Sequence, residues 1–240
     1  KMASQITHEV RNPLSSIGLN AELLEEELEE LEASSETVTM LRDIHHEVDR
    51  LKAITEEYLR YARPPRPNFN RVELDALLEN YLGFFSHELR EADVDLIRTP
   101  ADEALVPIHA DADQLRQVLI NLTRNAVEAL KEIDSPRVLE VGLALDVDDR
   151  VRLTVKDNGP GIDSEMLHQL FDPFVTGKSG GTGLGLALSR QIVVDHGGTI
   201  AVDSPISHFE ASSESNPGTC FTIVLPVEGP PQVVDTPGKG

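Results

Sequence analysis

Basic residues and cysteine are scarce in this chain of 240 residues. Lys and Arg total 21 against 42 Asp and Glu, which gives a formal net charge of −21. Affinity for nucleic-acid phosphates depends on clustered Lys and Arg, so we do not expect a general nucleic-acid binder. An anionic membrane surface would also repel such a chain. The single cysteine, Cys220, excludes an intrachain disulfide framework and favours a reducing compartment. Its alternating sequence context predicts a buried thiol in a strand rather than a nucleophile.

Long apolar runs are also missing. No stretch approaches the roughly 20 apolar residues of a membrane-spanning helix, and no signal peptide is visible. Hydrophobic residues make up 40% of the chain and charged residues 26%, which is typical of a globular protein with one large domain or two ordinary ones. We therefore expect a cytoplasmic fragment without membrane contact, cut from a longer protein that could be membrane-anchored elsewhere.

Glycine is nearly absent from residues 1–63, where apolar residues recur at alternating steps of three and four. This spacing predicts two helices joined near residues 33–35 as an αα-hairpin. A lone hairpin cannot enclose a core, so we expect two chains to pair as a four-helix bundle. The prolines that follow Arg63 end the second helix. The predicted seam consists of Ile6, Val10, Ile17, Ala21, Leu24, Leu28 and Leu31, then Leu41, Ile44, Val48, Leu51, Thr55, Tyr58 and Ala62.

The rest of the chain alternates strand and helix patterns. Such a mixture predicts an α/β sandwich, with helices on one face of a mostly antiparallel sheet. We expect a helical domain over 1–66, an α/β domain over 67–228 and a disordered tail over 229–240. The expected helices cover 72–91, 111–131 and 184–196. The expected strands cover 94–97, 106–109, 139–147, 151–155, 199–202 and 219–226, with a hairpin turn at Asp148 and Asp149.

The first chemical motif is the segment from His8 to Pro13. At about 100° per residue, His8 points away from the helical seam, and Asn12 follows on the same exposed face. Pro13 should distort the helix just beyond the histidine. A neutral imidazole can act as a nucleophile while Glu9 takes the proton from its other nitrogen. The alternative is an ordinary surface histidine.

Two amides and a carboxylate form the next motifs. Asn121 and Asn125 lie one turn apart at the edge of an apolar helix face, where their oxygens would suit Mg²⁺; a structural amide pair is the alternative. Asp157 continues the core-facing side of a strand, where a carboxylate is costly unless it accepts hydrogen bonds. An adenine amino group is a suitable donor, and Gly159 and Gly161 would let the backbone approach a flat ring. A tight turn capped by the aspartate is the alternative.

A glycine-rich stretch, residues 180–185, leads into the last predicted helix. Free backbone N–H groups and a helix N-terminus favour phosphate, and Lys178 could add a positive charge. The stretch follows no strand, unlike a Rossmann fingerprint, and lacks the Lys-Ser/Thr ending of a P-loop. Before it, Phe171 and Phe174 either fix the loop or pack in the core.

Together, in this order, the motifs resemble those of a sensor histidine kinase of two-component signalling over residues 1–226, most nearly the nitrogen-regulator-like subgroup. Residues 8–13 are similar to the phosphoacceptor box and 121–125 to the asparagine box. Residues 157–161 resemble the first glycine box, 171–174 the phenylalanine box and 181–185 the second glycine box. The resemblance implies a dimerisation and phosphotransfer hairpin followed by an ATP-binding domain of the Bergerat type, shared with gyrase, Hsp90 and MutL.

The resemblance also implies an activity. His8 would attack the γ-phosphoryl group of ATP and pass it to an aspartate of a response-regulator receiver domain. Glu9 would support this step, and Asn12 would orient a water in the reverse, phosphatase reaction. Mg²⁺ would be held by Asn121 and Asn125. The residues implied in nucleotide binding are Asn121, Arg124, Asn125, Asp157, Gly159, Gly161, Ile162, Lys178, Gly181, Thr182, Gly183, Leu184 and Gly185.

The sequence departs from the family pattern at three places. Glu128 stands where many members carry Lys, and Lys178 is the nearest cation after the phenylalanine box. The cation that contacts the phosphates is therefore open between Lys178 and Arg124. Residues 204–217 form a longer segment than the usual turn. Two other functions stay open: a stand-alone ATPase of the same fold, and a degenerate nucleotide-sensing dimerisation module. The first is disfavoured because its relatives place a glutamate at the position of Asn121, and an amide is a poor base.

Overall fold

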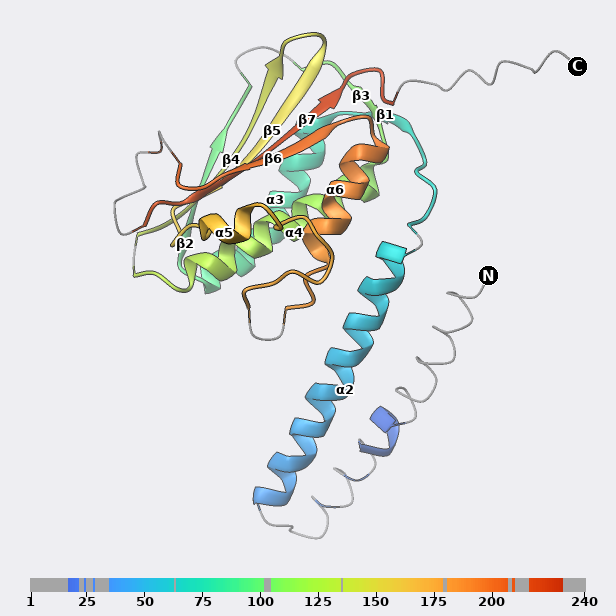
Figure 1. Cartoon of the computed structure of the whole chain (residues 1–240), viewed down its shortest axis with the longest axis vertical. Helices are drawn as coiled ribbons and strands as arrows, with labels where there is room; N and C mark the ends of the chain where they lie inside the picture. Colours follow the sequence, from blue (N-terminus) through green and yellow to red (C-terminus); the bar gives the residue numbers. More distant parts are fainter. Residues whose placement is uncertain are drawn as a thin grey trace, which may run out of the picture. The chain divides into compact units, whose positions relative to one another are not determined.

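The chain divides into two units (Figure 1). The computed structural model describes residues 17–21, 24, 28, 35–62, 64–101, 105–134, 136–178, 181–206, 209 and 216–230. The first unit comprises Lys1–Arg66 and Ser179–Leu184, and the second comprises Pro67–Lys178 and Gly185–Gly240. Within the described ranges, no helix is both long enough and apolar enough to cross a membrane.

The first unit contains the long helix α2 (Ser35–Ala62). Its residues Leu41 and Val48 lie seven positions apart and are buried. The helical residues 17–21 pack against this helix, because His45 Nε2 lies 3.0 Å from the carbonyl oxygen of Gly18. A Cβ added at Gly18 would lie 3.6 Å from a methyl group of Val48. The two segments therefore pack side by side, as the predicted hairpin requires.

A second apolar stripe on α2 stays exposed within the chain. Ile44, Leu51 and Tyr58 recur every seventh residue, and between 41% and 49% of each remains exposed. Ile17 and Leu24 of the preceding segment are exposed to a similar degree. A helix that buries one stripe and leaves a neighbouring apolar stripe uncovered is typical of a bundle completed by further helices.

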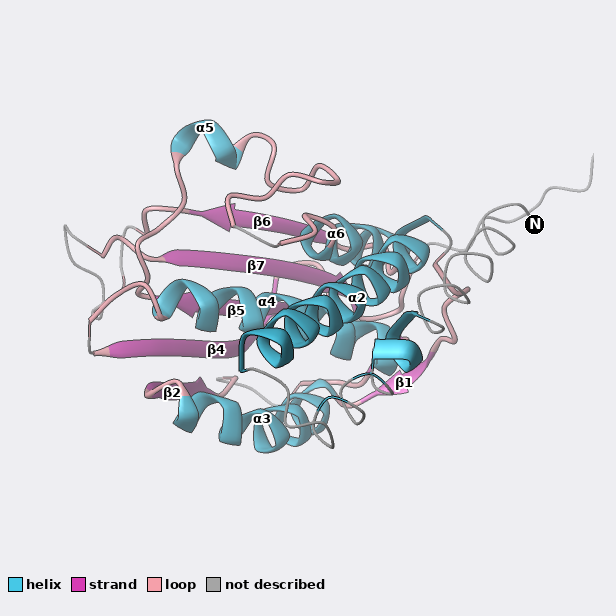
Figure 2. Cartoon of the chain, turned by 90° about the horizontal axis from the view of Figure 1, so that it is seen from below, coloured by secondary structure: helices cyan, strands magenta, loops and turns pink. Residues whose placement is uncertain are grey.

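The second unit is built on a five-stranded sheet whose order, β2-β4-β5-β7-β6, can be followed in Figure 2. Strands β2 and β4 pair in parallel, and the other neighbours pair antiparallel. Helices α3, α4 and α6 cover one face of the sheet (Figures 1 and 2). This arrangement confirms the predicted α/β sandwich. The strands are β2 (Val94–Thr99), β4 (Arg137–Asp146), β5 (Arg150–Asp157), β6 (Thr199–Asp203) and β7 (Thr219–Pro226); the helices are α3 (Leu74–Glu91), α4 (Ala112–Leu130) and α6 (Gly185–Asp195).

Two short elements were not expected from the sequence. Strand β1 (Asn70–Val72) pairs antiparallel with β3 (Ile108–Ala110), and α5 (Ser164–Leu167) forms a single turn. The predicted start of a helix at Val72 is therefore wrong, since α3 begins at Leu74. Val72 is apolar at a position that also fits the helical spacing, but pairing with a strand 36 residues later in the sequence decides its conformation.

The core lies between these helices and the sheet. Its largest fully buried side chains include Leu78, Leu119, Leu122, Leu139 and Ile223. Each such side chain contributes about 1.5–3 kcal/mol relative to an exposed position. The hairpin turn between β4 and β5 falls where the sequence predicts it. Asp146 pairs with Arg150, so residues 147–149 form the connection, and Asp148 and Asp149 within it both adopt positive φ values, of 57° and 51°. Cys220 is buried, as expected, and burial raises the pKa of its thiol.

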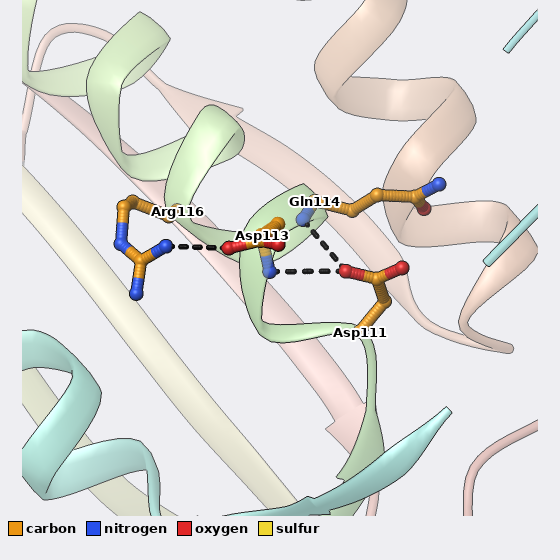
Figure 3. A network of polar contacts seen from close by, with 4 residues as sticks. All are labelled: Asp111, Asp113, Gln114 and Arg116. Carbon is orange, nitrogen blue, oxygen red and sulfur yellow. Dashed lines mark hydrogen bonds and ion pairs between the residues drawn. The ribbon is translucent and has the colours of Figure 1, made fainter. Parts of the chain in front are cut away.

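Helix α4 begins at an aspartate that binds three backbone amides. Asp111 Oδ1 accepts hydrogen bonds from the N–H groups of Asp113 and Gln114, both at 3.0 Å (Figure 3). Its Oδ2 accepts from the N–H of Asn68 at 2.7 Å. Partial burial would raise the pKa of Asp111, but these hydrogen bonds outweigh it and lower the pKa. The Asp113 carboxylate pairs in turn with Arg116 at 2.6 Å (Figure 3). This N-cap fixes the start of the helix that carries the two asparagines.

Candidate nucleotide site

Helix α4 presents Asn121 beside the first turn of α6. Asn121 Nδ2 donates to the carbonyl oxygen of Gly185 at 3.0 Å and to Ser189 Oγ at 3.2 Å. Its Oδ1 accepts from Gln117 Nε2 at 3.0 Å. The Asn121 amide therefore links α4 to α6 across 64 residues of sequence. The Asn121 oxygen accepts this one hydrogen bond and has capacity for a second partner. The predicted role of Asn121 as a Mg²⁺ ligand stays a prediction.

Asp157 ends β5 in the middle of the sheet. It pairs in register with Leu139 of β4 and Thr219 of β7, and only 3% of it is exposed. Its Oδ1 accepts a hydrogen bond from the Gly159 N–H at 2.9 Å. Burial raises the pKa of Asp157 to about 7, although the Gly159 amide and the nearby Lys178 ammonium both act to lower it. A further hydrogen-bond donor that reached this carboxylate would stabilise its charged form.

The backbone after Asp157 approaches α4 closely. A Cβ added at Gly159 would lie 2.8 Å from Asp157 Oδ1 and 3.2 Å from the Cβ of Ala129 on α4. A side chain does not fit there without displacing the buried carboxylate. Glycine at this position is therefore required by the close approach of the turn to the helix.

A second glycine continues the turn. Gly161 has a φ of 80°, in the left-handed region that favours glycine. The next residue, Ile162, donates its N–H to Ser204 Oγ at 2.9 Å, and this hydroxyl donates to the carbonyl of Gly218 at 2.9 Å. The described ends of the long 204–217 segment thus brace the glycine turn. Ser204 is a supporting residue that the sequence analysis missed.

Two opposite charges meet beside Asn125. Lys178 Nζ forms an ion pair with Glu128 Oε2 of α4 and lies 3.5 Å from Asn125 Oδ1. Arg124, the other candidate cation, lies beside α3, with its Nε 3.8 Å from Glu88 Oε1. Lys178, not Arg124, therefore lies next to Asn125.

The remaining predicted residues fall elsewhere. His8, Glu9 and Asn12 lie outside the described residues. Residues 181–184 belong to the first unit, where the Thr182 hydroxyl donates to Glu57 Oε2 of α2 and Leu184 is fully buried. Gly183 has a φ of 67°, and Gly185 begins α6 in the second unit. The nucleotide-binding roles of Gly181, Thr182, Gly183, Leu184 and Gly185 stay predictions.

The two phenylalanines that precede the loop differ. Phe171 packs against the core, with its ring centroid 6.5 Å from that of Phe221. Phe174 is 61% exposed and has a φ of 68°. Core packing therefore describes Phe171 but not Phe174.

Besides Ser204, two residues that support the site were not identified from the sequence. Gln117 lies one turn before Asn121 and Ser189 one turn after Gly185. The recurrence of amides at 117, 121 and 125 was a usable signal for the first, since such spacing places them on one helix face. Ser189 carried no comparable signal, because its contact with Asn121 spans 68 residues of sequence.

Family models match both parts of the chain. Residues 110–229, which include α4, the Asp157 turn and Lys178, match the model described as histidine kinase-, DNA gyrase B- and HSP90-like ATPase. Residues 1–66 match the His Kinase A (phospho-acceptor) domain. The chain belongs to the sensor histidine kinases. The predicted family resemblance is thereby confirmed.

This histidine kinase resembles several curated relatives over nearly its whole length. It is 38% identical to the sensor histidine kinase ZraS of Klebsiella oxytoca over 229 residues, which are 95% of this chain and 46% of ZraS. It is 34% identical to the sensory histidine kinase/phosphatase NtrB of Rhodobacter capsulatus over 241 residues, covering 94% of this chain and 61% of NtrB. The chain thus spans about half the length of such relatives.

A solved structure shows the same architecture. The histidine kinase ThkA, crystallised in complex with the response regulator TrrA, matches this histidine kinase with a TM-score of 0.64 and 28% identity. The match covers 94% of this chain and 61% of ThkA. It includes both the helical part and the α/β part, which agrees with the predicted fold class.

Proposed function

We propose that this chain is the catalytic part of an ATP-dependent protein-histidine kinase. It would phosphorylate its own His8 and pass the phosphoryl group to an aspartate of a response-regulator receiver domain. The observation that carries this proposal is the buried, destabilised carboxylate of Asp157 within the ATPase-like domain. That domain is joined in one chain to a phosphoacceptor domain.

Asp157 is proposed to read adenine. Its pKa of about 7 reflects a buried carboxylate whose charge the Gly159 amide and the Lys178 ammonium stabilise only in part. The exocyclic amino group of adenine would donate the missing hydrogen bond. Gly159 and Gly161 let the turn after Asp157 pass close to α4 and to Ser204, which fixes the backbone beside the carboxylate, and Ile162 is partly buried against the core.

Lys178 and Asn125 are proposed to receive the phosphates. The ammonium group and the amide oxygen lie 3.5 Å apart on the same face, so they can bind one phosphate–cation group together. Mg²⁺ would supply neutralisation of the phosphate charge, and an amide oxygen such as that of Asn125 fits its preference for oxygen ligands. Asn121 would hold α6 in place and, as a second step of the proposal, add an oxygen ligand. Arg124 is the weaker candidate for phosphate contact.

The phosphoryl transfer itself is assigned to the helical domain. An imidazole nitrogen of His8 would attack the γ-phosphorus while ADP leaves, and Glu9 would accept the proton of the other nitrogen. Catalysis would rest on positioning and charge neutralisation. In the reverse, phosphatase reaction, Asn12 would orient a water molecule for attack on the phospho-aspartate of the regulator. The proposed reaction needs ATP and a response-regulator receiver domain, so we place it in the cytoplasm.

Dimerisation is proposed to cover the exposed stripe on α2. Ile44 and Leu51 are 49% and 41% exposed in the single chain, and they repeat with the heptad period of a helical bundle. A second copy of the hairpin would bury them in a four-helix bundle. The high negative charge gives no reason to expect nucleic acid as a partner.

A stand-alone ATPase is the second candidate function. Its chemistry needs a base that activates water, and the family places this base on the helix that here carries Asn121. An amide cannot accept a proton near neutral pH, and the Asn121 side chain is engaged with Gln117, Gly185 and Ser189. The geometry therefore favours phosphotransfer over hydrolysis.

Incubation with γ-labelled ATP and Mg²⁺ tests the proposed function. We expect label on the protein that is lost in acid, as a phosphohistidine is. His8→Ala should abolish the label while ATP binding stays within about twofold, because Asn125, Asp157 and Lys178 lie in the other unit. Equal labelling of the His8→Ala variant would refute the assignment. Release of free phosphate without labelled protein would favour the ATPase.

A further inference from the structure

The ion pair between Lys178 and Glu128 joins the loop before α6 to helix α4. Lys178 ends the described loop segment that runs from Phe171, and Glu128 lies three residues after Asn125 on α4. Along the same segment, a Cβ at Gly177 would lie 2.9 Å from the Met166 methyl group of the preceding turn. Lys178, at the end of this segment, thus connects the loop to α4, the helix that carries Asn121 and Asn125.

This pair is easily exchanged. The Lys178 side chain is 38% exposed and that of Glu128 is 53% exposed. Ion pairs between exposed side chains contribute only about 0–1 kcal/mol, since water and salt screen them. A ligand that brings several negative charges to the same place will compete for the ammonium group.

The charges around Lys178 show what such a ligand would meet. The ammonium faces Glu128 and Asn125 of α4, and its field also acts on the Asp157 carboxylate. Phosphates bound beside Asn125 would therefore need the same cation that Glu128 now holds. When Lys178 turns to them, the Glu128 carboxylate loses its partner and stands next to further negative charge.

We propose that Glu128 is a positioning residue that holds Lys178 while no nucleotide is bound and gives it up to the nucleotide phosphates. The inference rests on the proposed function, because it takes Lys178 as the phosphate cation. Glu128 lowers the affinity for phosphorylated nucleotides, and it fastens the loop to α4 when no nucleotide is bound. The exchange thereby couples loop opening to phosphate binding.

Calorimetric titration of the full chain with ADP and with adenosine tests the exchange. Glu128→Gln should tighten ADP binding by about two- to fivefold, which corresponds to the worth of an exposed ion pair. Adenosine binding should stay unchanged, because adenosine has no phosphate. Glu132→Gln is the matched control: it removes the same charge from an exposed residue one turn further on and should leave both affinities unchanged.

A double-variant cycle shows whether Glu128 acts through the lysine. In a Lys178→Met background, the Glu128→Gln change should alter ADP affinity by less than about 1.5-fold, since the competition is gone. An equal gain in both backgrounds would overturn the proposal in favour of direct repulsion between Glu128 and phosphate. An equal change for adenosine would show a structural effect and overturn it too.

Hydrogen exchange gives an independent readout. In the empty protein, Glu128→Gln should speed exchange of the amides in residues 174–178, because the loop loses its tie to α4. Unchanged exchange together with unchanged ADP affinity would overturn the proposed switch while leaving nucleotide binding intact. If the unmodified chain binds neither ADP nor adenosine, the proposed function fails, and the exchange fails with it.

Discussion

The two ends of the candidate site hold their charges in opposite ways. Asp157 is 3% exposed, lies in the centre of the sheet and is fixed by a backbone amide of a turn that tolerates no Cβ. Lys178 lies on an exposed loop, and the side chain of its partner Glu128 is 53% exposed. The end proposed to bind adenine is thus fixed by the protein itself, whereas the end proposed to bind the phosphates would rearrange on binding. The comparison predicts that substitution of Asp157 has large effects, whereas substitution of Lys178 has small effects that depend on charge.

The largest effect should be on stability. Burial raises the pKa of Asp157 from 3.8 to about 7, so between these pH values the unfolded chain has lost a proton that the folded chain keeps. The free energy of unfolding should therefore fall as pH rises through this window, by on the order of 4 kcal/mol from this group alone. Above pH 7 the contribution is constant.

Urea unfolding at pH 5 and pH 8 measures this effect. Asp157→Asn removes the titration, so the variant should gain stability relative to the unmodified chain as pH rises from 5 to 8. Asp111 does not mask the trend, because its pKa is lowered and it titrates below this window. A stability difference that is the same at both pH values would contradict the burial argument.

The same variant should bind nucleotide less well. Asp157→Asn replaces an acceptor for the adenine amino group, so we expect a loss of about 2 kcal/mol, or about 30-fold in Kd. Adenosine and ADP should lose affinity by the same factor, since both carry the base. Calorimetry that shows a loss for ADP alone would move the carboxylate from the base to the phosphates.

An intermediate effect is expected where α4 meets α6. Asn121→Ala removes hydrogen bonds to Gly185 and Ser189 and should cost about 1–2 kcal/mol in urea unfolding. Asn80→Ala is the control, since Asn80 is exposed on α3 and, within the described part of the chain, its side chain donates to the Ala76 carbonyl oxygen of its own helix. Equal costs for the two variants would show that the link between the helices adds no stability.

The smallest effect should come from the exposed cation. Lys178→Met should weaken ADP binding by about fivefold at low salt and leave adenosine binding unchanged. The difference should shrink as salt is added. Lys131→Met, an exposed lysine just after α4, serves as the control. If Lys178→Met weakened adenosine as much as ADP, the distinction between the two ends of the site would fail.

The sequence predicted elements whose signals are local. The β4–β5 hairpin turn at Asp148 and Asp149 followed from alternation and turn chemistry, and the burial of Cys220 followed from its strand pattern. Strand β1 was not predicted, because three residues give little periodicity and its partner β3 is distant in the sequence.

The site shows the same limit. The residue types of Asp157 and Asn125 could be identified, but the α6 partners of Asn121 and the α4 partner of Lys178 lie 50 or more residues away. No local pattern decides between Arg124 and Lys178, because the choice depends on which side of α4 faces the loop. The structure places Arg124 beside Glu88 and Lys178 beside Asn125.

The cap of α4 has a consequence for protein engineering. The Asn68 amide, two residues into the second unit, bonds to the same Asp111 carboxylate that starts α4, and Phe69 packs on the rings of His109 and His196. A fusion that exchanges residues 1–66 for another helical part should therefore join at Arg66–Pro67. A junction placed after Phe69 would replace the residues that hold the start of the helix carrying Asn121.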